Sequence, residues 1–287
     1  DIIDASPCVQ IPAPSKENRR ERYLSEHEIK VFWKKLDDAK MSQEIKLALR
    51  FLLVTGQRKN EVIGAEWSEF DLKNKWWTIP AEKSKNKLTH RVPLASTAME
   101  ILNELKKITG QYQFVFASRV GHTKRNPERK AGMFPILGSA VDRALRNNQT
   151  NNLKTKQKNI FNLEHFTPHD LRRTVASMIT KSGVDRLVLK KILNHDDRGV
   201  TAVYDIYEYD KEKQVAMLAW DRELKKILVS QKRTKSKEFL PKKSKKTESK
   251  RAIPKKTIKE DGSTITYEQF LKEENLRDFT KKNNLIL

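Results

Sequence analysis

The chain has 287 residues, with 59 Lys and Arg against 37 Asp and Glu, and its formal net charge is +22 at pH 7. No apolar run approaches the roughly 20 residues of a membrane span, no signal peptide is visible, and the single cysteine, Cys8, excludes an internal disulfide and fits a reducing cytoplasm. Because the excess charge is basic, we expect a polyanionic partner, with nucleic acid ahead of an anionic membrane surface.

The N-terminal part predicts a linker followed by a helix. Residues 1–22 contain prolines and basic side chains without an apolar period, as a linker does. Since the sequence begins with Asp1 rather than Met, we expect it to be a piece of a longer protein. Ser25 is a good N-cap for a helix over residues 26–36, with Glu28 at the capping-box position.

A second helix, over residues 42–54, is strongly apolar and ends at Gly56, a natural C-cap. Arg58 follows at the start of a new helix, and Glu61 lies three residues further on. At that spacing the carboxylate can steady the guanidinium. The alternative is an ordinary surface ion pair, which would contribute little.

Beyond residue 75 the pattern changes from helical to strand-like. Residues 76–80 and 90–94 predict two antiparallel strands joined by a basic turn. The lysines of that turn are Lys83, Lys85 and Lys87. Such a cluster is more often a solubilising turn than a site, but next to a DNA site it would reach into the duplex.

The remaining pattern up to residue 228 is mostly helical. It predicts helices over residues 97–108, capped by Ser96, over 136–145 and over 211–228, with Val215, Leu218, Leu224 and Ile227 on the apolar side of the last. A short strand at 114–116 and an irregular loop over 147–162 complete this region.

The C-terminal segment differs in composition. Residues 232–259 hold 13 Lys or Arg against 2 acidic residues. We expect this segment to be disordered in isolation and attracted to phosphate. Residues 267–279 predict one amphipathic helix.

Residues 167–204 hold the densest group of candidate functional side chains. Thr167 is a good N-cap, Pro168 fits the first helical turn, and Asp170 occupies the capping-box position. His169 and Arg172 then share one face of that turn, at the end of a helix that favours an anion. Taken alone, this pair is also compatible with a solvated helix cap.

The rest of this stretch completes the set. Leu171, Val175, Met178 and Ile179 form an apolar stripe, and Gly183 closes the helix. A second helix, over residues 186–193, delivers His195, and Tyr204 follows nine residues later.

Together these candidates form a cationic site without a pair of carboxylates: Arg58, Lys85, His169, Arg172, His195 and Tyr204. A hard metal ion needs oxygen ligands, so the set suits a phosphodiester better than a metal. Guanidinium groups stabilise the charge that develops on phosphate oxygens. A tyrosine hydroxyl can attack phosphorus, and a lysine can protonate the leaving sugar oxygen. Because the covalent link conserves the backbone energy, we expect neither ATP nor a metal, and no other cofactor.

The order of these motifs resembles the catalytic domain of the tyrosine recombinases, in particular integrases of the phage and genomic-island type. The matching segments are residues 55–62, the strand-turn-strand that ends at 92–94, residues 167–174, and residues 193–195 with the tyrosine nine positions later. The similarity covers about residues 23–228, and the four motifs together are highly specific.

The resemblance implies a role for each residue. Arg58 and Arg172 would clamp the scissile phosphate, His169 and His195 would assist, and Tyr204 would be the nucleophile. Lys85 would be the general acid, because it stands seven residues before Val92, a spacing typical of the family. Further DNA contacts are expected from Lys83, Lys87, Arg173, Lys124 and Arg125, and a supporting role from Glu61.

The expected fold is mainly α-helical with a small antiparallel sheet that carries Lys85. We divide the chain into a linker-like segment, 1–22, a catalytic domain, 23–230, and a basic, largely disordered tail, 231–287. The resemblance implies that the partner is double-stranded DNA at attachment sites and that the full-length protein forms a tetramer on DNA. It also implies that accessory bending or excision proteins take part and that no membrane is involved. Family members also carry an N-terminal DNA-binding domain that completes a clamp, and only a linker-like start stands in its place here.

Other interpretations remain open. A type IB topoisomerase has a similar site, although residues 55–61 and 193–195 favour an integrase. A DNA-binding relative without catalysis is a second possibility, which the intact Arg58, His169, Arg172 and Tyr204 argue against. A zinc site at His165 and His169 is the weakest, because Pro168 begins the helix between them.

Overall fold

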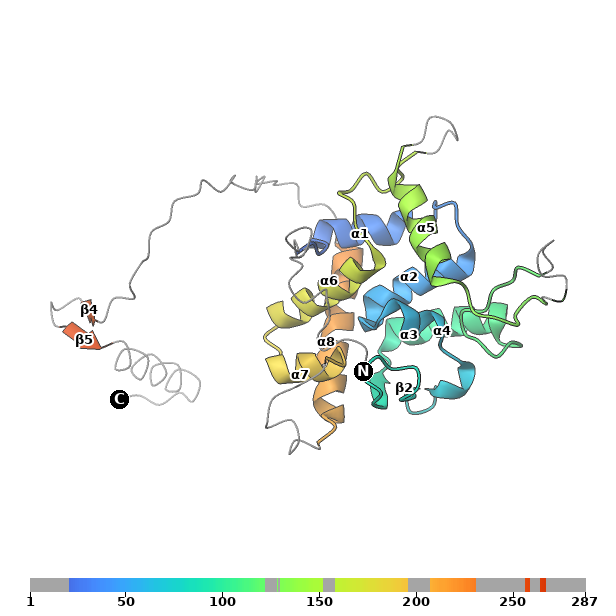
Figure 1. Cartoon of the computed structure of the whole chain (residues 1–287). Coiled ribbons are helices and arrows are strands. Elements are labelled where there is room, and N and C mark those ends of the chain that lie inside the picture. Colours follow the sequence, from blue (N-terminus) through green and yellow to red (C-terminus); the bar gives the residue numbers. More distant parts are fainter. Residues whose placement is uncertain are drawn as a thin grey trace, which may run out of the picture. The chain divides into compact units, whose positions relative to one another are not determined.

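Helix α2 (Gln43–Thr55) is a buried helix at the centre of a group of four other helices (Figure 1). The structure is a computed structural model that describes residues 21–121, 128, 130–151, 158–195 and 207–230, and the backbone of 256–258 and 264–266. The helix is buried along most of its length. The helices that contact it are α3 (Lys59–Ile63), α4 (Ser96–Thr109), α6 (Pro168–Lys181) and α8 (Asp210–Val229).

The helix ends follow the local sequence signals. Ser25 and Glu28 form the predicted capping box at the start of α1, and Gly56 ends α2 in the left-handed conformation, with φ of 68°. Pro168 stands in the first turn of α6, and Asp185 caps α7. The other helical elements are α1 (Glu26–Lys35), the 3-10 turn η1 (Trp67–Glu69), α5 (Gly138–Gln149) and α7 (Arg186–Ile192).

A small antiparallel sheet lies beside the helices. Its strands are β1 (Phe70–Asp71), β2 (Trp76–Ile79) and β3 (His90–Pro93), paired in that order. Trp77 faces Val92 across the β2–β3 pair and Phe70 across the β1–β2 pair, and its ring stacks on that of Phe70 at 5.3 Å. Phe51 of α2 contacts the same rings, so the sheet is fixed to the central helix by aromatic packing. The turn between β2 and β3 carries Lys85.

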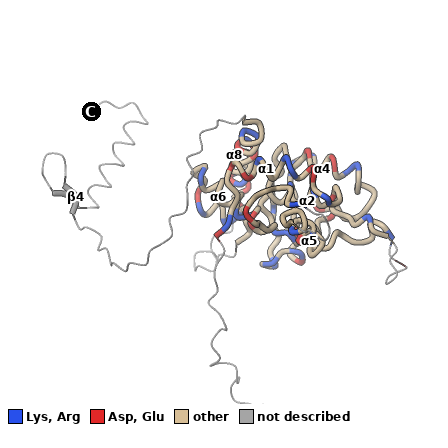
Figure 2. Tube along the Cα trace, turned by 90° about the horizontal axis from the view of Figure 1, so that it is seen from above, with Lys and Arg blue, Asp and Glu red and all other residues tan. Residues whose placement is uncertain are grey.

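The predicted fold class, mainly α-helical with a small antiparallel sheet, is confirmed. Lysines and arginines alternate with acidic residues along the tube of this unit instead of gathering on one element (Figure 2). Within the described ranges, no helix is both long enough and apolar enough to span a bilayer.

Three local predictions are wrong. Ser96 is not the N-cap of α4 but its first residue, and its hydroxyl bonds to Asp221 instead of the helix end. Residues 114–116 do not form a strand. They make one isolated bridge, between Glu66 and Phe114, because their backbone bonds go to Ala65 and Ile136, which belong to no strand. Helix α5 begins at Gly138 and continues to Gln149, into the segment predicted as a loop.

The apolar face of α8 was also assigned partly incorrectly. Leu224 and Ile227 are buried as predicted, but Val215 is 65% and Leu218 is 48% exposed. The buried face is instead centred on Trp220, whose indole N–H donates to the Leu53 carbonyl of α2 at 3.2 Å. Since successive residues of a helix are rotated by about 100°, fixing the face at Trp220 turns Val215 and Leu218 outward.

The chain divides into two units, Asp1–Lys232 and Arg233–Leu287. In the second, the described backbone forms one antiparallel pair, β4 (Lys256–Ile258) with β5 (Thr264–Thr266). Residues 1–20, most of the basic segment and the helix predicted over 267–279 lie outside the described residues. The three-part division of the chain stays a prediction.

Candidate active site

A cavity of about 520 Å³ opens where three segments distant in sequence meet, with Asp142 of α5 also in its wall. These are the turn from α2 into α3, the tip of the β2–β3 turn and the first turn of α6. The predicted site residues that line it are Arg58, Glu61, Lys85, His169 and Arg172, together with Lys83. The fold therefore brings together four of the six predicted catalytic residues, with Glu61 and Lys83 beside them.

Arg58 is held from two sides. Its Nη1 donates to Glu61 Oε1 at 2.9 Å, and the other oxygen of that carboxylate accepts the Arg58 backbone N–H at 3.1 Å. Its Nη2 donates to the Asn194 carbonyl at 2.7 Å. Because the Glu61 side chain is only 3% exposed, this ion pair is more than a solvated surface contact. Glu61 fixes the direction of the guanidinium.

Arg172 is more deeply buried, at 4% exposed. Its Nη1 donates to the Gly56 carbonyl at 2.9 Å, and its Nη2 donates to the Leu193 carbonyl. Burial, and next the charge of Arg58, lower the pKa of Arg172 to about 10, so the side chain is still protonated at neutral pH. Each Nη carries two hydrogens, so both nitrogens keep one for an anion in the cavity.

The end of α7 is the common acceptor for these cations. Its last carbonyls have no partner within the helix and carry partial negative charge, which suits guanidinium groups. The carbonyl of Ile192 accepts from Gln57 Nε2 at 3.0 Å and bonds His90 Nε2 at 3.2 Å. Since a carbonyl only accepts, this nitrogen of His90 carries its proton. Burial, with the nearby charge of Lys213, lowers the pKa of His90 to about 3, so the imidazole is neutral.

No role was predicted for these supporting residues, although Gln57 and Asn194 lie within the segments that resemble the family. They are Gln57, Ser84, Asn86, His90 and Asn194, and all bond to or near the end of α7. One signal was present: Asn194 follows the last residues of a helix, where asparagine, like glycine, tolerates the left-handed conformation. No pattern of period or spacing marks the others.

Of the two predicted histidines, His169 lines the cavity and His195 does not, although the charges of Arg172 and Arg58 act on it; both side chains are exposed. Partial burial and the charges of Arg173 and Arg172 lower the pKa of His169. The pKa of His195 falls to about 4, through burial and then the charges of Arg172 and Arg58. Both imidazoles are therefore neutral at pH 7, and each can donate one hydrogen bond and accept another.

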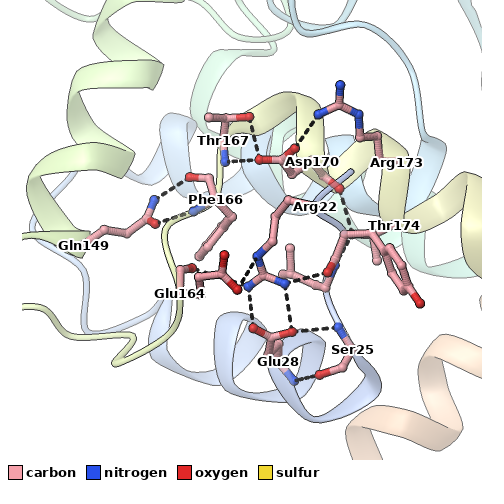
Figure 3. A network of polar contacts seen from close by, with 12 residues as sticks. Arg22, Ser25, Glu28, Gln149, Glu164, Phe166, Thr167, Asp170, Arg173 and Thr174 are labelled. Carbon is pink, nitrogen blue, oxygen red and sulfur yellow. Dashed lines mark hydrogen bonds and ion pairs between the residues drawn. The ribbon is translucent and has the colours of Figure 1, made fainter. Parts of the chain in front are cut away.

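A polar network fixes the first turn of α6, which carries His169 and Arg172 (Figure 3). The Asp170 carboxylate accepts the backbone N–H and the hydroxyl of Thr167, both at 2.9 Å. The Thr174 hydroxyl donates to the Asp170 carbonyl and accepts the Leu24 N–H, at 2.7 and 2.9 Å. Arg22, whose guanidinium pairs with Glu28 of α1, joins the same network (Figure 3).

The three turn lysines differ in their surroundings. Lys83 Nζ pairs with Glu66 at 2.6 Å and also with Glu69. Although burial alone would lower it, the pKa of Lys83 is raised by these two carboxylates, which hold its proton. Lys85 is exposed and lines the cavity, and Lys87 is exposed with φ of 55°. The engagement of Lys83 favours Lys85 as the proton donor.

The remaining site predictions stand outside the cavity or outside the described residues. Arg173 pairs with Asp170 at 2.8 Å and is partly exposed. Tyr204, Lys124 and Arg125 fall outside the described residues. Among the residues that the structure does describe, no group of three or more His, Cys, Asp or Glu is placed to hold a metal ion.

Comparison with known proteins gives a consistent result. The family model described as the phage integrase family matches residues 22–210. The integrase of Salmonella phage P22 is 29% identical over 191 residues, covering 67% of this chain and 44% of that protein. Prophage integrase IntA of Escherichia coli K12 is 25% identical over 224 residues, covering 76% and 48%.

A further relative and a solved structure are also similar to this chain. Tyrosine recombinase XerD of Oceanobacillus iheyensis is 26% identical over 203 residues, covering 71% of this chain and 63% of that protein. Among solved structures, the integrase from mycobacterium phage Brujita aligns over 77% of this chain and 68% of that chain, with 16% identity and a TM-score of 0.49. The chain spans about half the length of the first two relatives. Because the family model covers residues 22–210 of 287, this chain belongs to the phage integrase family of tyrosine recombinases.

Proposed function

We propose that this chain carries the strand-cleaving and rejoining site of a site-specific DNA recombinase, which integrates or excises a mobile element. The observation that carries the proposal is the meeting of Arg58 and Arg172 at one cavity, together with Lys85 and His169. Two fixed guanidiniums in the lining of a 520 Å³ cavity suit the tetrahedral phosphate of a DNA backbone.

The proposed chemistry is one in-line displacement and its reverse. The Tyr204 hydroxyl gives its proton to the neutral imidazole of His169 and attacks phosphorus, the bond to the 5′ oxygen breaks, and a 3′-phosphotyrosine forms. Lys85 gives its proton to the departing 5′ oxygen, which leaves as a hydroxyl. Rejoining runs backwards: a 5′ hydroxyl attacks the phosphotyrosine, and Tyr204 is released. One phosphodiester bond is exchanged for another, so no nucleotide is consumed.

The arginines act on the charge that develops during this step. In the transition state the non-bridging oxygens become more negative, and hydrogen-bond donors already aimed at them need not reorganise. The Gly56 and Leu193 carbonyls hold one hydrogen of each Arg172 Nη, so the outward hydrogens are set in direction before DNA arrives. His169 and His195, both neutral, complete the shell of donors and acceptors.

Tyr204 is proposed as the nucleophile because the neighbouring tyrosines have other partners. The Tyr207 hydroxyl donates to Glu212 at 3.4 Å, and partial burial together with that carboxylate raises its pKa, which opposes ionisation. Tyr209 packs against the core, with Lys191 over its ring at 5.2 Å. The Tyr207 hydroxyl is thus occupied by Glu212, and the Tyr209 ring by packing and by Lys191.

The proposed partner is double-stranded DNA at attachment sites. A complete exchange between two duplexes breaks four strands, and each chain holds one Tyr204 that stays bonded to the strand it cuts. We therefore propose that four copies act together in the full-length protein, with accessory DNA-bending or excision proteins.

The test is covalent capture. The chain is incubated with nicked duplexes of randomised core sequence, and adducts that resist detergent are isolated, sequenced and mapped by peptide. We expect a DNA-linked peptide at Tyr204, formed equally well in EDTA. Tyr204→Phe should bind DNA without forming adducts, while Tyr207→Phe and Tyr209→Phe should still form them. DNA binding without any adduct, an adduct at Tyr207 or Tyr209, or loss of adducts in EDTA would each contradict the proposal.

A further inference from the structure

Asn194 lies where the parts of the site meet. It lies between Leu193, the C-cap of α7, and His195, and its backbone is left-handed, with φ of 48°. Its carbonyl accepts Arg58 Nη2 at 2.7 Å. The same carbonyl accepts Asn86 Nδ2 at 2.9 Å, and its own side-chain amide donates to Ser84 Oγ at 2.9 Å. A single residue thus contacts both the first arginine and the β2–β3 turn.

The two turn residues that bond Asn194 are the neighbours of Lys85 on either side. Ser84 is 5% exposed and Asn86 is half-buried, whereas the Lys85 side chain is exposed. An exposed lysine has many rotamers, so its reach is set mainly by where its backbone is held. The backbone of Lys85 is held through Ser84 and Asn86, and both are fixed to Asn194.

Asparagine suits this position for two reasons at once. Only glycine, and asparagine or aspartate to a lesser extent, adopt the left-handed conformation at low cost. Glycine has no side chain to donate to Ser84, and an ionised aspartate has no donor. Asparagine alone combines the backbone conformation with an amide that reaches the turn.

We propose that Asn194 is a positioning residue. It places Lys85 so that the lysine can protonate the leaving 5′ oxygen while Arg58 binds the phosphate. Its carbonyl orients Arg58, and its amide holds the turn that carries Lys85. One residue therefore positions both Lys85, which donates the proton, and Arg58, which binds the phosphate. The inference rests on the proposed function, since it assigns a positioning residue to the same cleavage step.

The test compares two substrates that differ in one atom. One nicked duplex carries a normal phosphodiester, and the other has sulfur in place of the bridging 5′ oxygen. A thiolate leaves without being protonated, so the second substrate bypasses the lysine. Lys85→Ala sets the benchmark: it should cleave the normal substrate slowly and the sulfur substrate at nearly the normal rate. Equal defects on both would remove Lys85 from the role of acid and overturn the positioning proposal with it.

Asn194→Gly removes the bond to Ser84 and a longer contact of 3.4 Å from Asn86 Nδ2 to Asn194 Oδ1, whereas glycine keeps the left-handed backbone and the carbonyl that Arg58 and Asn86 share. We expect it to cleave the normal substrate roughly ten- to a hundredfold more slowly, as a misplaced catalytic group does, and the sulfur substrate at close to the normal rate. Ser84→Ala should show the same selectivity, and the double variant should be no slower than Asn194→Gly, since the bond between Asn194 and Ser84 is already absent in Asn194→Gly.

A matched control is Asn162→Gly, which changes another asparagine with positive φ, at 50°, whose side chain is exposed. It should leave both rates unchanged. If Asn194→Gly and Ser84→Ala slow both substrates equally, or slow neither, Asn194 does not act through Lys85 and the inference is overturned while the proposed function stands. If the unmodified chain binds DNA but forms no adduct on either substrate, the proposed function itself fails.

Discussion

At the scale of single residues, Gly56 shows how folding and the site depend on the same atoms. Its φ of 68° lies in the left-handed region, which disfavours any residue with a Cβ. A Cβ built there would lie 2.9 Å from Cγ1 of Val175 in α6. Its carbonyl accepts a hydrogen bond from Arg172. The residue that ends α2 therefore also sets how closely α6 approaches and where one guanidinium points.

Gly56→Ala is expected to destabilise the fold through strain and overpacking together. The left-handed backbone costs about 1–2 kcal/mol, and displacing Val175 adds about 1–3 kcal/mol. Urea unfolding followed by circular dichroism measures the sum. Gly183→Ala is the matched control, because its φ of 79° is equally left-handed but its Cβ would meet nothing within 4 Å. Equal losses in the two variants would show that the contact with Val175 costs nothing.

At the scale of elements, α8 provides the N-terminal cap that α4 lacks. Ala95 occupies the N-cap of α4 and has no side chain to offer. The Asp221 carboxylate of α8 accepts the Ser96 hydroxyl at 2.7 Å and the Thr97 N–H at 3.0 Å. Burial alone would raise the pKa of Asp221, but the bonds from Thr97 and Ser96 outweigh it and hold this pKa below its ordinary value. A carboxylate from a distant helix thus satisfies the start of α4.

Asp221→Ala is expected to cost about 1–2 kcal/mol of unfolding free energy at pH 7, as losing a helix cap does. Because the folded pKa is lowered, this stabilisation is fully present above the unfolded pKa of about 4 and is lost as the pH falls through the folded value. The difference from the unmodified chain, measured by urea unfolding, should therefore shrink below about pH 4.

The control for that experiment is Glu223→Ala, which removes an exposed pair with Lys226 on the same helix. This variant should change the unfolding free energy by less than about 0.5 kcal/mol, both at pH 7 and below about pH 4. A difference between Asp221→Ala and the unmodified chain that stays constant down to pH 3 would contradict a role for the ionised carboxylate.

Local signals predicted the helices and the hairpin well, because caps and periods act within a few residues. The capping boxes of Ser25 and Thr167, Gly56 at the end of α2, and the two strands of the hairpin were all readable. Strand β1 was not, since two residues hold too little pattern and pair only because β2 is adjacent. The outward Val215 and Leu218 were missed because Trp220, buried against α2, decides which face of α8 turns inward.

The site follows the same division. Arg58 with Glu61, and His169 with Arg172, are neighbours in sequence, so their pairing could be predicted from spacing. The bonds from Arg58, Arg172 and His90 to the end of α7 join residues more than twenty positions apart, and no local pattern encodes them. The proposed roles of the site residues remain predictions.

At the scale of the whole molecule, the C-terminal segment adds charge that the cavity does not use. Residues 232–259 carry 13 Lys or Arg and 2 acidic residues. Each lysine or arginine that neutralises a phosphate releases a counterion, which makes binding steeply dependent on salt. We infer that this segment contributes affinity for DNA without regard to sequence.

A chain that ends at Ser230 should therefore bind duplex DNA with a shallower dependence of log K on log salt concentration. Each lost phosphate contact lowers the slope by about 0.9. The measurement is fluorescence anisotropy from 50 to 200 mM salt, conditions over which such slopes are resolved. A full-length variant with the basic residues of 232–259 replaced by Gln is the control, and it should match the truncated chain. An unchanged slope in both would assign the segment to a protein partner.

The docking of α8 on α2 has a consequence for the covalent integrity of the chain. Helix α8 is bound to the rest of its unit by Trp220, Leu224 and Ile227, and by the Asp221 cap, contacts that do not depend on the residues linking it to α7. A protease site engineered within residues 196–203 would therefore yield two polypeptides that still elute together and separate only in denaturant. Tyr204 belongs to the smaller of the two pieces, so on the proposed mechanism the DNA adduct of the cut protein would form on that piece.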